Sequence, residues 1–101
     1  MEQLALALVG VILILLGRTN MKGNISTIHW YNRTKVTGDD IPKYGRVVGL
    51  GSVIIGVSFL ITAGLECFVQ AAWTPVIALA GLAIGIGFIL YGQFKYNKGI
   101  F

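Results

Sequence analysis

The sequence predicts an all-α integral membrane protein with three transmembrane helices, its N-terminus outside and its C-terminus in the cytoplasm. Only 12% of the 101 residues are charged, 55% are hydrophobic, and the mean hydropathy is +0.79. A soluble domain carries roughly a quarter charged residues, so this chain lacks the charge needed to cover a water-exposed surface. Residues 3–17, 47–65 and 67–94 contain no Asp, Glu, Lys or Arg. Since about 20 helical residues cross a hydrocarbon core, the last two segments span it and the first is marginal.

The first helix is expected over residues 2–18. A secretory signal peptide begins with positive charge and ends in a small-residue cleavage site, whereas here Glu2 precedes the apolar run and Arg18 follows it. At about 1.5 Å per residue the run is shorter than the hydrocarbon core. We therefore expect a retained span that needs Arg18 to snorkel or the bilayer to become thinner around it.

A basic cytoplasmic loop is expected over residues 19–41. From Arg18 to Arg46 the chain carries six Lys and Arg residues against Asp39 and Asp40. An apolar patch within the loop is typical of a headgroup boundary, which favours an interfacial helix there. The patch consists of Ile25, Ile28, Trp30 and Tyr31.

The second helix is expected over residues 42–67 and the third over residues 75–96. Asp39 or Asp40 can accept hydrogen bonds from free backbone N–H groups, and Pro42 suits a first helical turn. Before the third helix, Trp73, Thr74 and Pro75 are interpreted as an interfacial aromatic residue, an N-cap and an N1 proline. The single membrane domain therefore covers residues 1–101.

The positive-inside rule orients the three spans. It counts Lys and Arg in short loops beside the spans. The first loop and its flanks hold six such residues and the C-terminal tail holds Lys95 and Lys98, while the expected outer segments hold none. With three spans, both basic clusters fall on the cytoplasmic side only when the N-terminus is outside.

Small residues recur four apart in the second and third spans and form stripes that let helix backbones approach closely. The stripes consist of Gly45, Gly49, Ser52, Gly56, Gly81 and Gly85. One interpretation is packing within the three-helix unit. The other is a homo-oligomer or a contact with a partner membrane protein, because three short helices leave outer faces free.

The composition argues against several function classes. One histidine and one cysteine cannot complete a tetrahedral metal site, and no acid–base pair or activated nucleophile is recognisable, so we expect neither cofactor nor enzymatic activity. The basic residues flank apolar runs and do not line one face, which disfavours nucleic acid as a partner. Ionisable residues are missing from the middle of every span, which disfavours an autonomous pump.

The basic loop is the strongest candidate for a binding site. Arg33, Lys35, Lys43 and Arg46 could hold anionic headgroups of membrane lipids by charge-assisted hydrogen bonds, with Trp30 and Tyr31 beside them. The alternative is that these residues only determine the topology.

Residues 30–37, with the sequence Trp-Tyr-Asn-Arg-Thr-Lys-Val-Thr, precede Gly45, Arg46 and Gly49 at the start of a glycine-rich helix. This pattern resembles an uncharacterised family of small bacterial membrane proteins with three short helices. The resemblance extends over roughly the whole chain but depends on a short motif. It implies a bacterial plasma membrane and says little about chemistry.

A weaker similarity adds Thr34 and Thr37 to the binding-site candidates, beside Arg33. They match the Arg-Thr-x-x-Thr run of the immunity family that protects bacteria from the sporulation-delaying toxin, with Tyr44 in place of that family's tryptophan. The distance from Tyr44 to Gly49 is shorter than in that pattern, and the chain has fewer spans. Together these features favour a small non-enzymatic accessory or immunity-type protein that binds a peptide, a partner subunit or anionic lipid. The alternative is one subunit of a multimeric transporter or channel.

Overall fold

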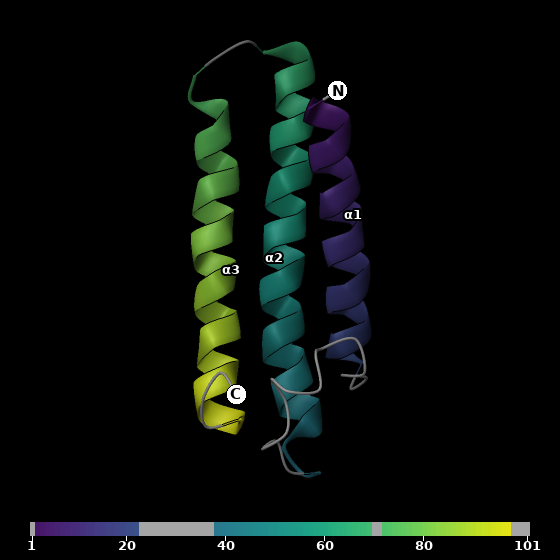
Figure 1. Cartoon of the computed structure of the whole chain (residues 1–101), viewed down its shortest axis with the longest axis vertical. Helices are drawn as coiled ribbons and strands as arrows, with labels where there is room; N and C mark the ends of the chain where they lie inside the picture. Colours follow the sequence, from purple (N-terminus) through teal and green to yellow (C-terminus); the bar gives the residue numbers. More distant parts are fainter. Residues whose placement is uncertain (1, 23–37, 70–71, 98–101) are drawn as a thin grey trace.

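The computed structural model describes residues 2–22, 38–69 and 72–97 of the chain. They form three α-helices: α1 (Glu2–Met21), α2 (Ile41–Phe68) and α3 (Thr74–Tyr96) (Figure 1). Each helix is long and apolar enough to cross a membrane. The all-helical architecture and the three membrane-length helices that the sequence predicts are thus confirmed for this part of the chain.

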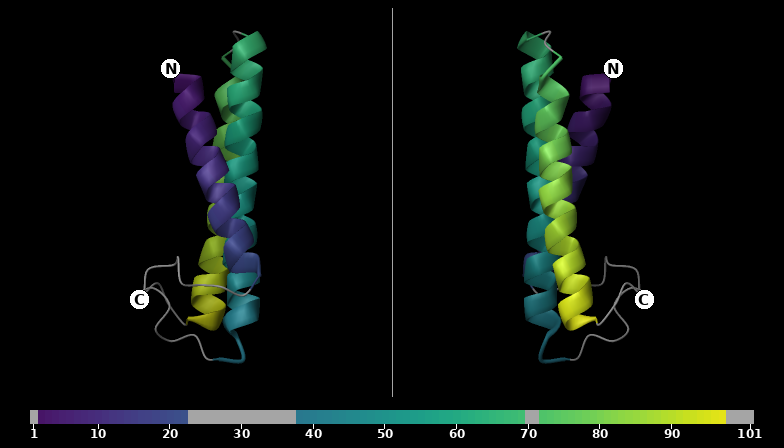
Figure 2. Two further views of the ribbon diagram at one scale, coloured as in Figure 1. Left: turned by 90° about the vertical axis from the view of Figure 1, so that its right-hand side faces the viewer. Right: turned by 90° about the vertical axis from the view of Figure 1, so that its left-hand side faces the viewer.

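α2 is the central helix of the bundle. It runs antiparallel to both neighbours and packs against α1 on one side and α3 on the other (Figures 1 and 2). In its most apolar stretch 44% of the residues are buried, against 17% in each outer helix. The longest extent of 47 Å is comparable with a bilayer of about 40–45 Å including its headgroups. Each outer helix therefore leaves most of its apolar surface to the surroundings.

The end of α1 differs from the prediction. The helix continues to Met21, whereas the sequence suggested an end at residue 18 and a loop from residue 19. The hydroxyl of Thr19 donates a hydrogen bond of 3.0 Å to the backbone oxygen of Leu15, so the polar residues prolong the helix. Its 20 residues reach about 30 Å, but the added residues are mostly polar, so the charge-free run of residues 3–17 remains shorter than a hydrocarbon core.

The helix starts also differ in detail. Asp40 occupies the N-cap position of α2, but its side chain makes no capping hydrogen bond. Its backbone is already helical, with φ −92° and ψ −11°, whereas a capping side chain normally extends from an extended backbone. The N-cap of α3 is Trp73, and Thr74, which the sequence suggested for that role, is the first residue of the helix. Each proline lies in the first turn, as expected.

Two pairs of glycines bring α1 and α2 together. A Cβ atom added to Gly10 would lie 2.8 Å from the backbone oxygen of Gly56, and one added to Gly17 would lie 2.5 Å from that of Gly49. Ser52 lies between the two pairs and donates a hydrogen bond of 2.7 Å to the backbone oxygen of Leu13. Only glycine allows the two backbones to approach this closely.

α2 and α3 pack through a different face of α2. A Cβ on Gly51 would lie 2.5 Å from the backbone oxygen of Gly85, and one on Gly81 would collide with the side chain of Ser58. Gly92 lies nearer the C-terminal end of α3, where an added Cβ would contact the side chain of Val48. Gly51, Gly81, Gly85 and Gly92 are therefore used for contacts within the chain.

Candidate functional site

Most of the predicted binding residues lie outside the described part of the chain. These are Trp30, Tyr31, Arg33, Thr34, Lys35 and Thr37. The remaining two, Lys43 and Arg46, lie in the first two turns of α2 with exposed side chains. The predicted packing residues Gly45, Gly49, Ser52, Gly56, Gly81 and Gly85 are all buried.

The described basic residues gather at one end of the bundle, because α1 and α3 end there and α2 begins there (Figure 1). We call this the basic end; its described Lys and Arg residues are Arg18, Lys22, Lys43, Arg46 and Lys95. At the opposite end, within the residues that the structure describes, the charged side chains are Glu2 and Glu66. Asp39 and Asp40 also lie at the basic end, but its five described positive charges against these two negative ones still polarise the bundle along its length.

Beneath the basic end lies a layer of buried polar side chains. Tyr44 is fully buried, and its hydroxyl donates a hydrogen bond to Oε1 of Gln93 on α3. Its ring packs on Val48 at the seam between α2 and α3. Asn20 on α1 and Asn97 after α3 are buried at the same end. Buried polar groups normally have hydrogen-bond partners, so this layer fixes the relative positions of the helix ends.

Lys95 on α3 has an aromatic environment. Its ammonium donates a hydrogen bond of 2.8 Å to the hydroxyl of Tyr91, one turn earlier on the helix. It also lies 5.3 Å from the ring centroid of Tyr91 and 5.6 Å from that of Tyr96, within the range of cation–π attraction. All three side chains remain at least partly accessible. The arrangement presents a positive charge and a hydroxyl side by side at the basic end.

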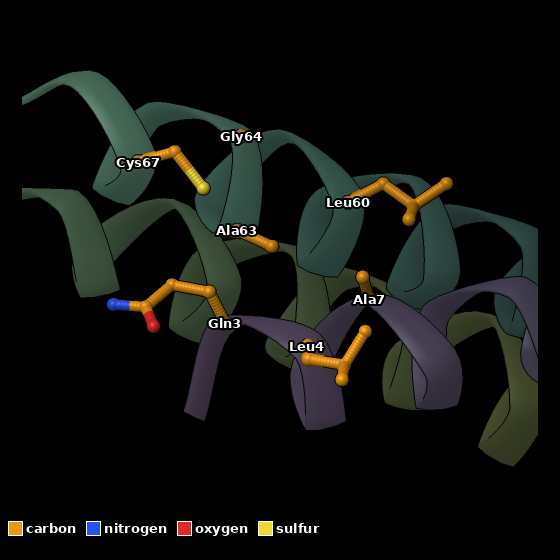
Figure 3. A pocket seen from close by; sticks show the side chains of 7 residues that line it. All are labelled: Gln3, Leu4, Ala7, Leu60, Ala63, Gly64 and Cys67. Atoms are coloured by element: carbon orange, nitrogen blue, oxygen red, sulfur yellow. The ribbon is translucent and has the colours of Figure 1, made fainter. Parts of the chain in front are cut away.

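A groove of about 510 Å³ opens between α1 and α2 at the opposite end. It forms because α1 inclines away from α2 towards its N-terminus, beyond the contact of Gly10 with Gly56 (Figure 2). Figure 3 shows its lining, with the thiol of Cys67 turned towards the groove. The lining residues are Gln3, Leu4, Ala7, Leu60, Ala63, Gly64 and Cys67. Apart from Gln3 and Cys67 it offers only hydrocarbon.

A second groove, of about 410 Å³, lies on the outer face of α3 and is lined by Ile84, Gly87, Phe88 and Tyr91. Gly87 leaves its centre open, because a Cβ at this position would meet no other atom within 4 Å. Tyr91 thus belongs both to this groove and to the pair with Lys95.

The basic end and the two grooves offer surfaces that can bind a ligand. Among the described residues no group of three His, Cys, Asp or Glu side chains is placed to hold a metal ion. The basic end offers N–H and O–H donors with positive charge, which suit phosphate or carboxylate oxygens. The grooves offer apolar surface of the kind that accepts an acyl chain or another apolar segment.

Sequence reasoning did not identify several of these residues. The pairing of Lys95 with Tyr91 follows a spacing of four residues, which places two side chains on the same face of a helix. Gly10 and Gly17 on α1 are seven residues apart, and so are Gly49 and Gly56, the glycines of α2 that they contact. Both spacings are visible in the sequence, but the partner of each glycine depends on helix register.

Comparisons with protein-family models, with curated proteins and with solved structures find no match to this chain.

Proposed function

We propose that this chain is a non-enzymatic accessory protein of the cell membrane whose basic end binds anionic lipid headgroups at the cytoplasmic surface. The observation that carries the proposal is the gathering of the described Lys and Arg residues at one end of three membrane-length helices. A basic residue near an anionic leaflet contributes roughly 1 kcal/mol of attraction. Several such residues at one end therefore favour a stable and oriented contact with the anionic leaflet.

The proposed topology places the N-terminus outside and the basic end in the cytoplasm. It follows from the positive-inside rule applied to the loop, the tail and the helix ends. The resemblance of residues 30–37 and the start of α2 to small bacterial membrane proteins supports a bacterial plasma membrane. The weaker similarity of Arg33, Thr34 and Thr37 to the immunity family supports an immunity-type role. In that role the basic end would lie at the cytoplasmic surface of the membrane and would bind a peptide or a partner subunit there.

The topology predicts that Cys67 is accessible from outside the cell. Its exposed thiol is the only one in the chain and lies near the end of α2 opposite the basic end. A membrane-impermeant maleimide should label it in intact cells to the same extent as in permeabilised cells. A Cys67→Ser variant supplies the background. Labelling that requires permeabilisation would reverse the proposed orientation.

The lipid contact predicts a graded loss of affinity. Replacing Lys43 or Arg46 by Gln should weaken binding of phosphatidylglycerol to the detergent-solubilised protein about fivefold each, because each change removes roughly 1 kcal/mol of attraction. Both side chains are exposed, so folding should be unaffected. The amount of phosphatidylglycerol that copurifies with the protein from mixed detergent–lipid micelles at low and high salt measures the effect, which should shrink as salt screens the charges.

The matched control for this test is Glu66→Gln at the opposite end of the bundle. It removes one charge of the other sign and should leave binding unchanged. Equal binding of wild type, Lys43→Gln and Arg46→Gln to phosphatidylglycerol would show that these residues act only on topology.

A further inference from the structure

We infer that the outer face of α3 carries a binding site for one phospholipid with an anionic headgroup. The phosphate is held by Lys95 and Tyr91, and one acyl chain lies in the groove of Ile84, Gly87 and Phe88. The inference rests on the proposed function, since it identifies a particular ligand and site within the same basic end.

The headgroup half of the site is the pair formed by Lys95 and Tyr91. The Tyr91 hydroxyl accepts one hydrogen bond from Lys95, at 2.8 Å, and keeps its own proton for another acceptor. The ammonium has three N–H groups and uses one of them in this bond. Its nearest partners among the described residues are the hydroxyl and rings of Tyr91 and Tyr96, and the attraction of the Asp40 carboxylate ranks behind both tyrosines. Two donors and one positive charge side by side complement a phosphate group.

The acyl-chain half is the groove that begins at the same tyrosine. Its volume of about 410 Å³ lies within the range of about 300–1,000 Å³ that is usual for ligand pockets. Gly87 forms its open centre, with Ile84 and Phe88 on the lining. Because Tyr91 lines the groove and also binds Lys95, the two halves form one continuous surface.

The length of this surface fits one leaflet. Ile84 and Lys95 are eleven positions apart on α3, which corresponds to about 16 Å along the helix. Half of a hydrocarbon core is about 15 Å thick. A lipid whose phosphate contacts Lys95 at the end of the helix would therefore have its chain beside Ile84 near the middle of the membrane. Charge at one end and apolar lining along the rest match a phospholipid better than a second transmembrane helix.

The test is native mass spectrometry of the full chain in mild detergent, titrated with phosphatidylglycerol or with phosphatidylcholine of identical acyl chains. Wild type should bind one phosphatidylglycerol in preference to phosphatidylcholine. Lys95→Gln should weaken that binding about fivefold and Lys95→Arg less than twofold, because the positive charge is retained. Gly87→Leu fills the groove and should weaken phosphatidylglycerol binding about threefold. That loss corresponds to about five carbon–carbon contacts between the acyl chain and the groove.

Gly64→Leu is the matched control. Like Gly87→Leu, it adds a leucine at a position where a Cβ would meet no atom within 4 Å. Gly64, however, lies on α2 and lines the groove between α1 and α2. The affinity of this variant for phosphatidylglycerol should equal that of wild type. Glycerol phosphate, which has the headgroup chemistry without acyl chains, should not displace phosphatidylglycerol from wild type, because the site also needs the acyl chain.

Several outcomes would overturn the inference. The inference is wrong if both Lys95→Gln and Gly87→Leu bind phosphatidylglycerol with wild-type affinity. It is also wrong if wild type forms a dimer that Gly87→Leu does not form, since a second copy of the chain would then occupy the groove. If Lys43→Gln and Arg46→Gln still reduce the phosphatidylglycerol that copurifies from mixed micelles in that case, the proposed function stands and only this site is wrong. If wild type binds phosphatidylglycerol and phosphatidylcholine equally in both assays, the proposed function fails as well.

Discussion

Replacing Gly49 by leucine is expected to separate α1 from α2 and to lower the free energy of unfolding by about 3 kcal/mol or more. Overpacking a close contact commonly costs about 1–3 kcal/mol, and the cost is highest where no side chain can move aside. A Cβ at Gly49 would collide with the backbone oxygen of Gly17 and lie 2.9 Å from the backbone nitrogen of Met21. Backbone atoms of a helix cannot move aside without moving the whole helix.

Two measurements check this prediction. Reversible unfolding in mixed detergent micelles gives the stability, and electron spin resonance distances between a label on native Cys67 and one on Leu8→Cys report the α1–α2 separation. The distance distribution should broaden markedly in Gly49→Leu. Gly64→Leu on the same helix, with open space around it, should retain or slightly raise the stability, because leucine favours a helix more than glycine does. Equal stability of the two variants would show that α1 does not pack on Gly49.

Replacing Tyr44 by alanine is expected to lower the free energy of unfolding by about 3–5 kcal/mol, as for other large buried aromatic side chains. Tyr44 is fully buried, packs on Val48, and donates a hydrogen bond to Gln93 across the seam between α2 and α3. The substitution removes the ring and its hydrogen bond together. The same unfolding assay measures the loss.

A double-mutant cycle separates the hydrogen bond from the packing. Tyr44→Phe retains the ring and should cost about 0.6 kcal/mol, the mean for hydrogen bonds between membrane helices, and at most about 1.7 kcal/mol. In a background of Gln93→Leu the same change should cost clearly less, because the bond across the seam is already lost. A loss below about 1 kcal/mol for Tyr44→Ala would mean that this ring does not hold the two helices together. Such a small loss is far below the usual cost of deleting a buried aromatic ring.

The part of the fold that sequence reasoning predicted is the set of three membrane-length helices. It followed from charge-free runs, and Pro42 and Pro75 marked the starts of α2 and α3. The end of α1 was placed too early, since Arg18 was taken as the boundary of the apolar run. Helical hydrogen bonding does not stop where apolar residues stop, and Thr19 continues it through its bond to Leu15.

The candidate site was predicted less completely. Lys43 and Arg46 lie at the basic end, as their position after the loop suggested, while the loop residues lie outside the described part of the chain. Lys95 was recognised only as a charge that orients the chain. Its pairing with Tyr91 next to a groove at Gly87 depends on side-chain directions that charge counting does not contain.

The sequence alone determined the three membrane-length helices of the described residues and the distribution of charge along them. Both are local properties, because apolar length and flanking charge decide how a segment meets a bilayer. Only the tertiary structure decided that α2 is central, that Gly10 and Gly17 meet Gly56 and Gly49, and that Gly87 stays open. In lipid the hydrophobic effect does not select helix partners, so the choice depends on how closely two particular backbones can approach. That approach is a property of two helices in register and cannot be read from either helix alone.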